Sequence, residues 1–199
     1  GRRSLLRSVV AGVRFDYVVE TGTFRGGSTA FLADISGRTV YTVESDPVAG
    51  AYAGRLFAGR PDVVTAIDDS RHFLGRLAAE LATAEPVLFY LDAHWDEEDL
   101  PLWGEIETIF SKWAHPVVVI DDFEVPGDDG YGFDHYGPGR ALCLAELVPR
   151  LVPGVEVWSP TLPSSEETGE RRGCVVLVRS SPPTGWAPGD LLRMVHRSA

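Results

Sequence analysis

The sequence predicts an α/β protein built on a doubly wound, mostly parallel sheet of seven strands whose last strand is antiparallel. Short runs of Val, Leu and Ile alternate with segments whose apolar residues recur at helical spacing. Each run is apolar almost throughout, which is typical of parallel strands covered on both faces. The last two runs are joined by a turn-like segment instead of a helix, which favours an antiparallel end of the sheet.

The elements follow in a regular order. Asp46-Pro47 begins a helix, because proline early in a helix has no N–H to lose. Ser70 follows two acids that can cap the next helix, and residues 101–113 place aromatic and aliphatic side chains at helical spacing. The expected strands are 17–19, 39–43, 63–67, 87–91, 116–120, 155–158 and 173–178, and further helices are expected at 3–12, after Ser28 to about 34, and near 140–150.

Composition limits the possible classes of protein. The 199 residues fit one domain, 1–199, with 44% apolar and 24% charged residues. No apolar run approaches the roughly 20 residues that span a bilayer, and a net charge of −11 argues against a nucleic-acid partner. We therefore expect a protein that binds neither nucleic acid nor membrane. Its two cysteines, Cys143 and Cys174, are too few for a disulfide framework and have no metal-ligand spacing, which favours a cytoplasmic protein. A homo-oligomer is left open.

A glycine-rich turn follows the first strand. Residues 20–28 read Glu-Thr-Gly-Thr-Phe-Arg-Gly-Gly-Ser and lead into a helical pattern. Glycine allows the backbone to approach a ligand closely, and the start of a helix offers free N–H groups. The spacing differs from the Gly-x-Gly-x-x-Gly of dinucleotide folds. The alternative is a corner whose glycines serve only packing.

Acids stand where the expected strands end, and ligands of open parallel sheets bind beyond those ends. Glu44, after the second strand, can accept the two ribose hydroxyls of a nucleoside, although NAD enzymes use the same position. The alternative for Glu44 is a solvated loop acid. The other acids at strand ends are Glu20, Asp68, Asp69, Asp92, Asp121 and Asp122.

The glycine-rich segment resembles the first motif of class I S-adenosylmethionine (SAM) methyltransferases, and most closely that of small-molecule O-methyltransferases. This resemblance implies a Rossmann-like fold with SAM as the cofactor. It places Asp69 and Ser70 against adenine, although both can equally cap a helix. The cofactor-binding residues that it implies are Glu20, Gly22, Thr23, Phe24, Gly26, Gly27, Ser28, Glu44, Ser45, Asp69, Ser70 and Asp92.

The segment Asp92-Ala93-His94, the later acid Glu105 and the pair Asp121-Asp122 resemble the layout of macrocin O-methyltransferase-like sugar methyltransferases and the cephalosporin hydroxylase-like family. The resemblance implies a metal held by Asp92, Asp121 and Asp122. Three carboxylates suit a hard ion such as Mg²⁺.

The catalytic residues implied are Asp92 and His94, with His94 taking the proton of the acceptor hydroxyl. Three alternatives stay open. Asp92 can contact the methionine amino group without a metal, His94 can be a plain surface histidine, and Asp121-Asp122 can be capping acids at a loop.

Residues 123–139 contain five glycines and two prolines and predict a long loop, which in a compact domain is typically a lid or binding segment. Its aromatic and acidic side chains suit a polyhydroxylated acceptor. The candidate substrate residues are Tyr131, Phe133, His135 and Tyr136. The alternative is an ordered loop whose aromatic side chains pack on the edge of the sheet.

The resemblance thus implies a metal-assisted, SAM-dependent methyltransferase that acts on a hydroxyl of a small molecule such as a sugar or natural product, with Mg²⁺ as the expected metal. Two rivals remain. One is a SAM-fold module that binds a ligand without turnover, and the other is a hydroxylase-like or NAD-dependent enzyme. The missing dinucleotide glycine spacing argues against the NAD version.

Overall fold

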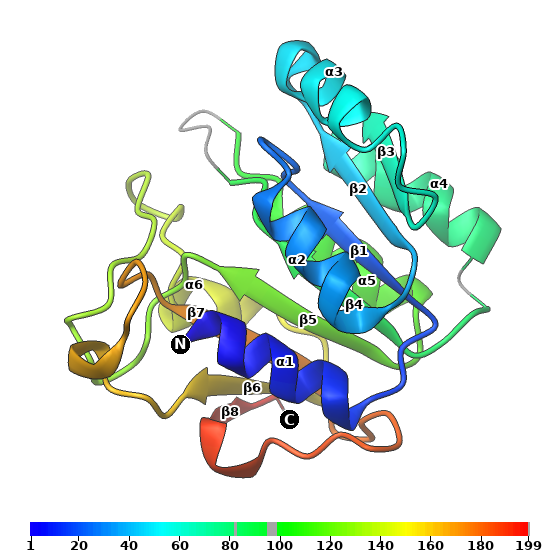
Figure 1. Ribbon diagram of the computed structural model, residues 1–199. Helices are drawn as coiled ribbons and strands as arrows, with labels where there is room; N and C mark the ends of the chain where they lie inside the picture. Colours follow the sequence, from blue (N-terminus) through cyan, green and yellow to red (C-terminus); the bar gives the residue numbers. More distant parts are fainter. Residues whose placement is uncertain (82, 95–98, 199) are drawn as a thin grey trace.

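The computed structural model describes residues 1–81, 83–94 and 99–198, through which one eight-stranded sheet runs (Figure 1). Its spatial order is β3-β2-β1-β4-β5-β7-β6-β8. The strands are β1 (Tyr17–Thr21), β2 (Val40–Glu44), β3 (Val63–Ile67), β4 (Val87–Leu91), β5 (Pro116–Asp121), β6 (Val155–Pro160), β7 (Cys174–Arg179) and β8 (Leu192–Arg197).

The strand directions confirm the predicted fold class and add one strand. Strands β1 to β5 are parallel, and β7 lies antiparallel between β5 and β6. The addition is β8, which pairs antiparallel with β6 at the edge of the sheet. Its sequence, Leu-Arg-Met-Val-His-Arg, mixes apolar and basic residues and is largely exposed, so β8 lacks the continuous apolar run that marks the other strands.

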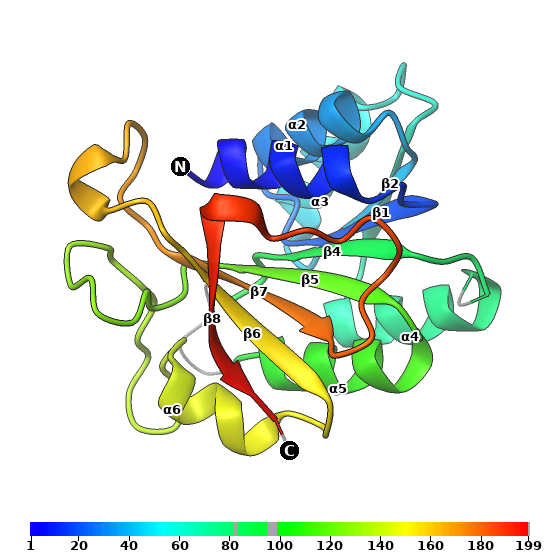
Figure 2. The same ribbon diagram turned by 90° about the horizontal axis from the view of Figure 1, so that it is seen from below.

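Helices cover both faces of the sheet, and Figure 2 shows them on opposite sides. One face carries α1 (Arg2–Gly12), α2 (Gly27–Ser36) and α3 (Pro47–Leu56), and the other carries α4 (Ser70–Leu81), α5 (Leu102–Lys112) and α6 (Leu144–Leu147). The helix expected near 140–150 is only this single α-turn followed by a 3₁₀ turn at Val148–Arg150. Pro149 lies in that turn and has no N–H for a longer α-helix.

Two apolar cores explain why the strand sequences are apolar throughout. Val18 and Leu88 belong to the core under α1 to α3, and the next residues, Val19 and Phe89, belong to the core under α4 and α5. All four are fully buried. Among the described residues, no helix combines the length and apolar character that crossing a bilayer requires.

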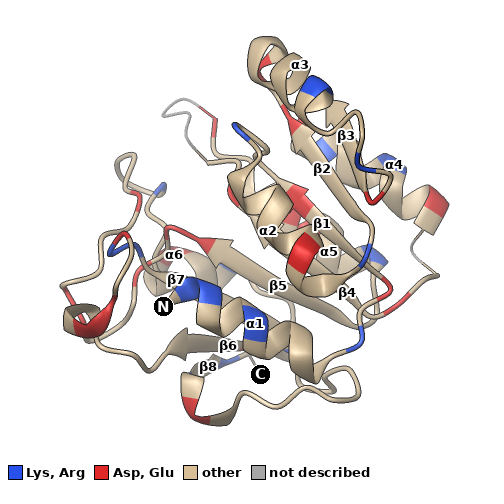
Figure 3. Ribbon diagram, viewed as in Figure 1, with Lys and Arg blue, Asp and Glu red and all other residues tan. Residues whose placement is uncertain are grey.

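The parallel register brings the carboxyl ends of the central strands to one edge. Thr21 pairs with Leu91, and Leu91 pairs with Ile120, so the residues that follow β1, β4 and β5 lie side by side. Figure 3 shows acidic residues at these strand ends and basic residues along α1. The predicted site residues therefore gather where ligands of open α/β sheets bind.

Candidate functional site

A cleft opens at this edge as two cavities that share Gly22 and Glu44 in their walls. The smaller, of about 160 Å³, is lined by Gly22, Val43, Glu44, Ser45, Asp68, Asp69, Ser70, Arg71, Ala93, Asp99 and Pro101. The larger, of about 400 Å³, is lined by Gly22, Phe24, Glu44, Asp46, Ala49 and Asp92. We call the two together the strand-end cleft. Seven of the twelve expected cofactor residues line it: Gly22, Phe24, Glu44, Ser45, Asp69, Ser70 and Asp92.

Glu44 stands between the two cavities with its carboxylate held in place. One oxygen accepts the Phe24 N–H at 2.7 Å, and the other accepts the Asp46 N–H at 2.9 Å. Only 5% of Glu44 is exposed, so it is not the solvated loop acid of the alternative interpretation. Each oxygen keeps a second lone pair for a hydroxyl donor.

The glycines of the first turn have different roles. Gly22 has φ +88°, and a Cβ there would lie 2.3 Å from the backbone oxygen of Asp92. Gly26 has φ +75° and packs against the Phe57 ring, whereas a Cβ on Gly27 would meet open space. Packing thus accounts for Gly26, and close approach of β1 to β4 accounts for Gly22. Gly26, Gly27 and Ser28 do not line the strand-end cleft.

Glu20 and Thr23 lie beneath the cleft and do not line it. The Glu20 carboxylate accepts hydrogen bonds from the hydroxyls of Thr29 and Thr42, and burial raises its pKa. The Thr23 hydroxyl lies 2.6 Å from that of Thr42. Both residues therefore belong to a buried polar network that supports the turn.

Asp69 and Ser70 line the smaller cavity, and Asp69 also caps α4 as the alternative proposed. Its carboxylate accepts the Arg71 backbone N–H at 2.8 Å and the Arg71 Nε–H at 3.0 Å, and the Arg71 guanidinium lowers the pKa of Asp69 to about 2. Arg71 also contacts Asp99 at 2.6 Å. The sequence did not predict that Arg71 and Asp99 line the cavity. The position of Arg71 two residues after Asp69 was the one local indication of their contact.

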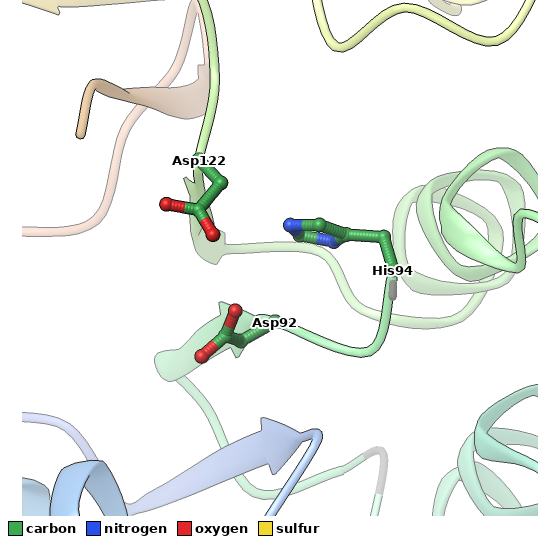
Figure 4. Close-up of side chains that lie close together, drawn as sticks. All are labelled: Asp92, His94 and Asp122. Carbon is green, nitrogen blue, oxygen red and sulfur yellow. The ribbon is translucent and has the colours of Figure 1, made fainter. Parts of the chain in front are cut away.

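A second group adjoins the cleft through Asp92. One potential ligand atom from each of Asp92, His94 and Asp122 lies within 4.8 Å of the others, and Figure 4 shows the three side chains converging. His94 is 2% exposed, and its imidazole lies beside the Asp121 backbone. It is therefore not the surface histidine of the alternative interpretation.

The charge states in this group follow from its burial. Burial lowers the pKa of His94, so the imidazole is neutral near pH 7. Burial raises the pKa of Asp92 to about 9, with further contributions from the negative charges of Asp121, Asp122 and Glu20. A positive charge bound here would favour the ionised form of Asp92.

The convergent group differs from the expected set of three carboxylates, because it contains His94 and not Asp121. The Asp121 carboxylate accepts hydrogen bonds from the Arg2 guanidinium, the Tyr90 hydroxyl and the Asp122 N–H. The donor atoms that converge instead are two carboxylates and one imidazole.

The three residues fit a divalent cation. Bonds of about 2.1 Å place two ligand atoms at most about 4.2 Å apart, so side-chain shifts of under an ångström would complete the site. Carboxylates suit Mg²⁺ and Mn²⁺, while imidazole suits later transition metals. Because the group contains an imidazole in place of a third carboxylate, its ligands suit Mn²⁺ or Fe²⁺ as well as the expected Mg²⁺.

Of the four candidate substrate residues in the 123–139 segment, Tyr136 contacts the convergent group. The Tyr136 hydroxyl lies 2.5 Å from the Asp134 carboxylate and also contacts the His94 carbonyl oxygen. Phe133 is half-buried and His135 is exposed. Tyr131 was expected to face the substrate, but it is buried, and its hydroxyl donates to the Leu162 carbonyl at 3.0 Å. Tyr131 therefore lies apart from the convergent group and packs against the segment around Leu162.

Comparison with solved structures identifies proteins of similar fold. No known family profile matches the sequence, and no curated protein matches it significantly. Solved structures do match. An O-methyltransferase from Bacillus cereus, in complex with SAH, has a TM-score of 0.63 and 22% identity over 89% of this chain and 79% of its own. The O-methyltransferase TomG from Streptomyces achromogenes, involved in tomaymycin synthesis and in complex with SAM, has a TM-score of 0.61 and 18% identity over the same shares.

The same fold also occurs in an rRNA methylase from Streptococcus thermophilus, with a TM-score of 0.54 and 16% identity over 89% of this chain and 93% of its own. The chain therefore has the fold of class I SAM-dependent methyltransferases. At these identities the likeness defines the fold and leaves the acceptor to be inferred from the site.

Proposed function

We propose that this protein transfers a methyl group from SAM to a hydroxyl of a small molecule. One observation carries the proposal. A buried, hydrogen-bonded Glu44 stands between two cavities of the strand-end cleft, and Asp92 connects that cleft to a convergent group of two carboxylates and an imidazole. The first feature suits a nucleoside, and the second suits an acceptor hydroxyl.

The cleft offers a complementary surface for each part of SAM. The Glu44 carboxylate would accept the ribose hydroxyls, with adenine in the smaller cavity beside Ser45, Asp69 and Ser70. The methionine part would extend past Gly22 toward Asp92. SAM carries a sulfonium and an ammonium group. Either charge near Asp92 would offset the cost of ionising a buried carboxylate.

Asp92, His94 and Asp122 are proposed to hold a divalent cation. When bound, such an ion lowers the pKa of an acceptor hydroxyl and orients it for transfer. The protein's own contribution is alignment, because the methyl group moves only when nucleophile, carbon and sulfur are in line. Tyr136 and Asp134 lie beside this group, and we propose Tyr136 as a residue that contacts the acceptor. Phe133 and His135 of the 123–139 segment stay candidates for the same role.

The acceptor is proposed to be small and hydroxylated, of the sugar or natural-product kind. The net charge of −11 opposes the phosphate contacts that an RNA acceptor requires. Assignment to the cytoplasm belongs to the same proposal.

Calorimetric titration tests the cofactor. We expect SAM and SAH to bind with dissociation constants on the order of micromolar, and NAD⁺ not to bind. Turnover of SAM in a screen of hydroxylated acceptors then separates an enzyme from a binding module. If SAM and SAH fail to bind while NAD⁺ binds, the methyltransferase proposal is wrong.

The role of His94 needs its own experiment. His94→Gln removes the imidazole and keeps a polar side chain of similar size. If His94 is a ligand, this variant loses affinity for Mn²⁺ by about tenfold or more. If His94 is instead the base predicted from the sequence, Mn²⁺ affinity is kept and only turnover falls.

A further inference from the structure

The Asp121 carboxylate is buried among donors that come from three separate parts of the chain. Its Oδ1 accepts from the Arg2 guanidinium and from the Asp122 N–H at 2.9 Å, and its Oδ2 accepts from the Tyr90 hydroxyl. Asp121 is 4% exposed and Tyr90 is 5% exposed. With these donors in place, Asp121 faces Arg2 and Tyr90 and not the convergent group.

The next residue, Asp122, has an unusual backbone conformation. Its φ is +52°, in the left-handed region that few residues other than glycine adopt. Its N–H donates to Asp121, its carbonyl accepts the Asp134 N–H at 2.9 Å, and its Oδ1 accepts from Arg172 Nε at 2.7 Å. Such a conformation persists where its surroundings determine it from several sides. Here it turns the Asp122 side chain toward Asp92 and His94 (Figure 4).

We propose that Arg2, Tyr90 and Asp121 form a positioning network that fixes Asp122 for ligand binding without themselves contacting the ligand. The inference rests on the proposed function, because it concerns the residue that would hold the cation. Asp121 is then a positioning residue in place of the metal ligand that its sequence pattern implied.

Arg2 is the member that joins distant parts of the molecule. It lies on α1, which is packed on the sheet through the buried side chains of Leu5, Leu6 and Val9. Its Nη1 contacts Asp121 and lies 3.5 Å from Asp122 Oδ1. A buried carboxylate without a positive partner is strongly unfavourable, and the Arg2 guanidinium is the positive partner of Asp121 at this position.

The change in Mn²⁺ affinity caused by Arg2→Met distinguishes a simple charge effect from positioning of Asp122, because the two roles predict changes of opposite sign. If Arg2 acted only as a nearby positive charge, its removal would strengthen binding of Mn²⁺. If it positions Asp122, its removal weakens Mn²⁺ binding by about tenfold, as loss of an outer-shell partner typically does. Arg7→Met is the matched control, because Arg7 lies on the same helix and stacks on Phe31, away from the acids.

Asp121 variants complete the experiment. Asp121→Asn keeps an oxygen for the Asp122 N–H, so hydrogen exchange of the Asp122 amide, followed by NMR, stays close to that of the unmodified protein. Asp121→Leu removes the acceptor and speeds this exchange by about tenfold or more. Arg2→Met falls between the two, and Arg7→Met matches the unmodified protein.

Two outcomes would overturn the network. One is Mn²⁺ affinity that is unchanged or increased in Arg2→Met, and the other is equal exchange of the Asp122 amide in all variants. If the unmodified protein binds SAH but no Mn²⁺, the cation part of the proposed function fails. The exchange rates, which need no metal, then decide the network alone.

Discussion

Glu44 and Asp121 both end a strand at the same edge, but they are held in different ways. Glu44 accepts hydrogen bonds from two backbone N–H groups, those of Phe24 and Asp46, which lie 20 and 2 positions away. Asp121 takes two of its three from Arg2 and Tyr90, which lie 119 and 31 positions away. The carboxylate on the β1–β3 half of the edge is therefore held by backbone groups, whereas the carboxylate on the β4–β5 half depends on side chains of α1 and β4. Four predictions test this comparison.

The largest effect is expected where the two halves meet. Gly22→Ala combines an unfavourable positive φ with a Cβ 2.3 Å from the Asp92 carbonyl oxygen. We expect the free energy of unfolding, measured in urea, to fall by about 3 kcal/mol or more. Gly27→Ala is the control, because a Cβ there meets open space at the start of α2, and its stability should match or exceed the original. Equal losses in both variants would contradict the close approach of β1 to β4.

Glu105 of α5 lies at the same junction, beside the hydroxyls of Thr21 and Ser70, and is fully buried. Burial raises its pKa from 4.5 to about 7. The folded state therefore binds the Glu105 proton more tightly than the unfolded state does. Stability is lost as pH rises from 4.5 to 7 and stays lost above pH 7.

Glu105→Gln removes this dependence. The difference in unfolding free energy between the variant and the original should grow by about 3 kcal/mol, in favour of the variant, between pH 4.5 and pH 7. Urea titrations at several pH values measure it. If the difference in unfolding free energy does not change with pH, burial does not raise the pKa of Glu105, and this prediction is wrong.

Glu44→Gln tests the half of the edge whose carboxylate is held by backbone groups. Loss of charge-assisted bonds to the ribose hydroxyls should weaken SAH binding by about 30-fold. Asp62→Asn is the control, because it makes the same charge change on the same half of the sheet, outside the cleft, where Asp62 pairs with the exposed Arg60. It should change SAH affinity by less than about threefold. If the control variant loses more SAH affinity than Glu44→Gln, Glu44 does not bind the ribose.

The smallest effect is expected for an exposed ion pair on the β1–β3 half. Arg60 contacts Asp34 at 2.9 Å and Asp62 at 2.8 Å in solvent. Solvent and salt screen such pairs, so Arg60→Met should leave the urea midpoint and SAH affinity unchanged within error. A clear loss in Arg60→Met, together with no effect of Arg2→Met, would contradict the greater weight of the buried ion pair of Asp121.

The same contrast explains what could be predicted from the sequence. The central strands were predictable because each is apolar on both faces, and Glu44 was predictable because its position follows directly from the end of β2. The edge strand β8 was missed because half-exposed residues do not form an apolar run.

The composition of the convergent group was not predictable in the same way. Whether His94 or Asp121 joins Asp92 depends on the left-handed turn at Asp122 and on where α1 packs. Arg2 and Arg172 reach Asp122 from opposite ends of the chain. Similarly, the spacing of aromatic residues in 123–139 does not reveal that Tyr131 points inward while Tyr136 reaches His94. These choices are made by three-dimensional packing.

A crystal structure of the protein with SAH and Mn²⁺ tests the central claim most directly. The account predicts ribose hydroxyls on Glu44 and an anomalous manganese peak between Asp92, His94 and Asp122, with Asp121 still bonded to Arg2 and Tyr90. A manganese peak on the Asp121 carboxylate, or SAH bound away from Glu44, would contradict it.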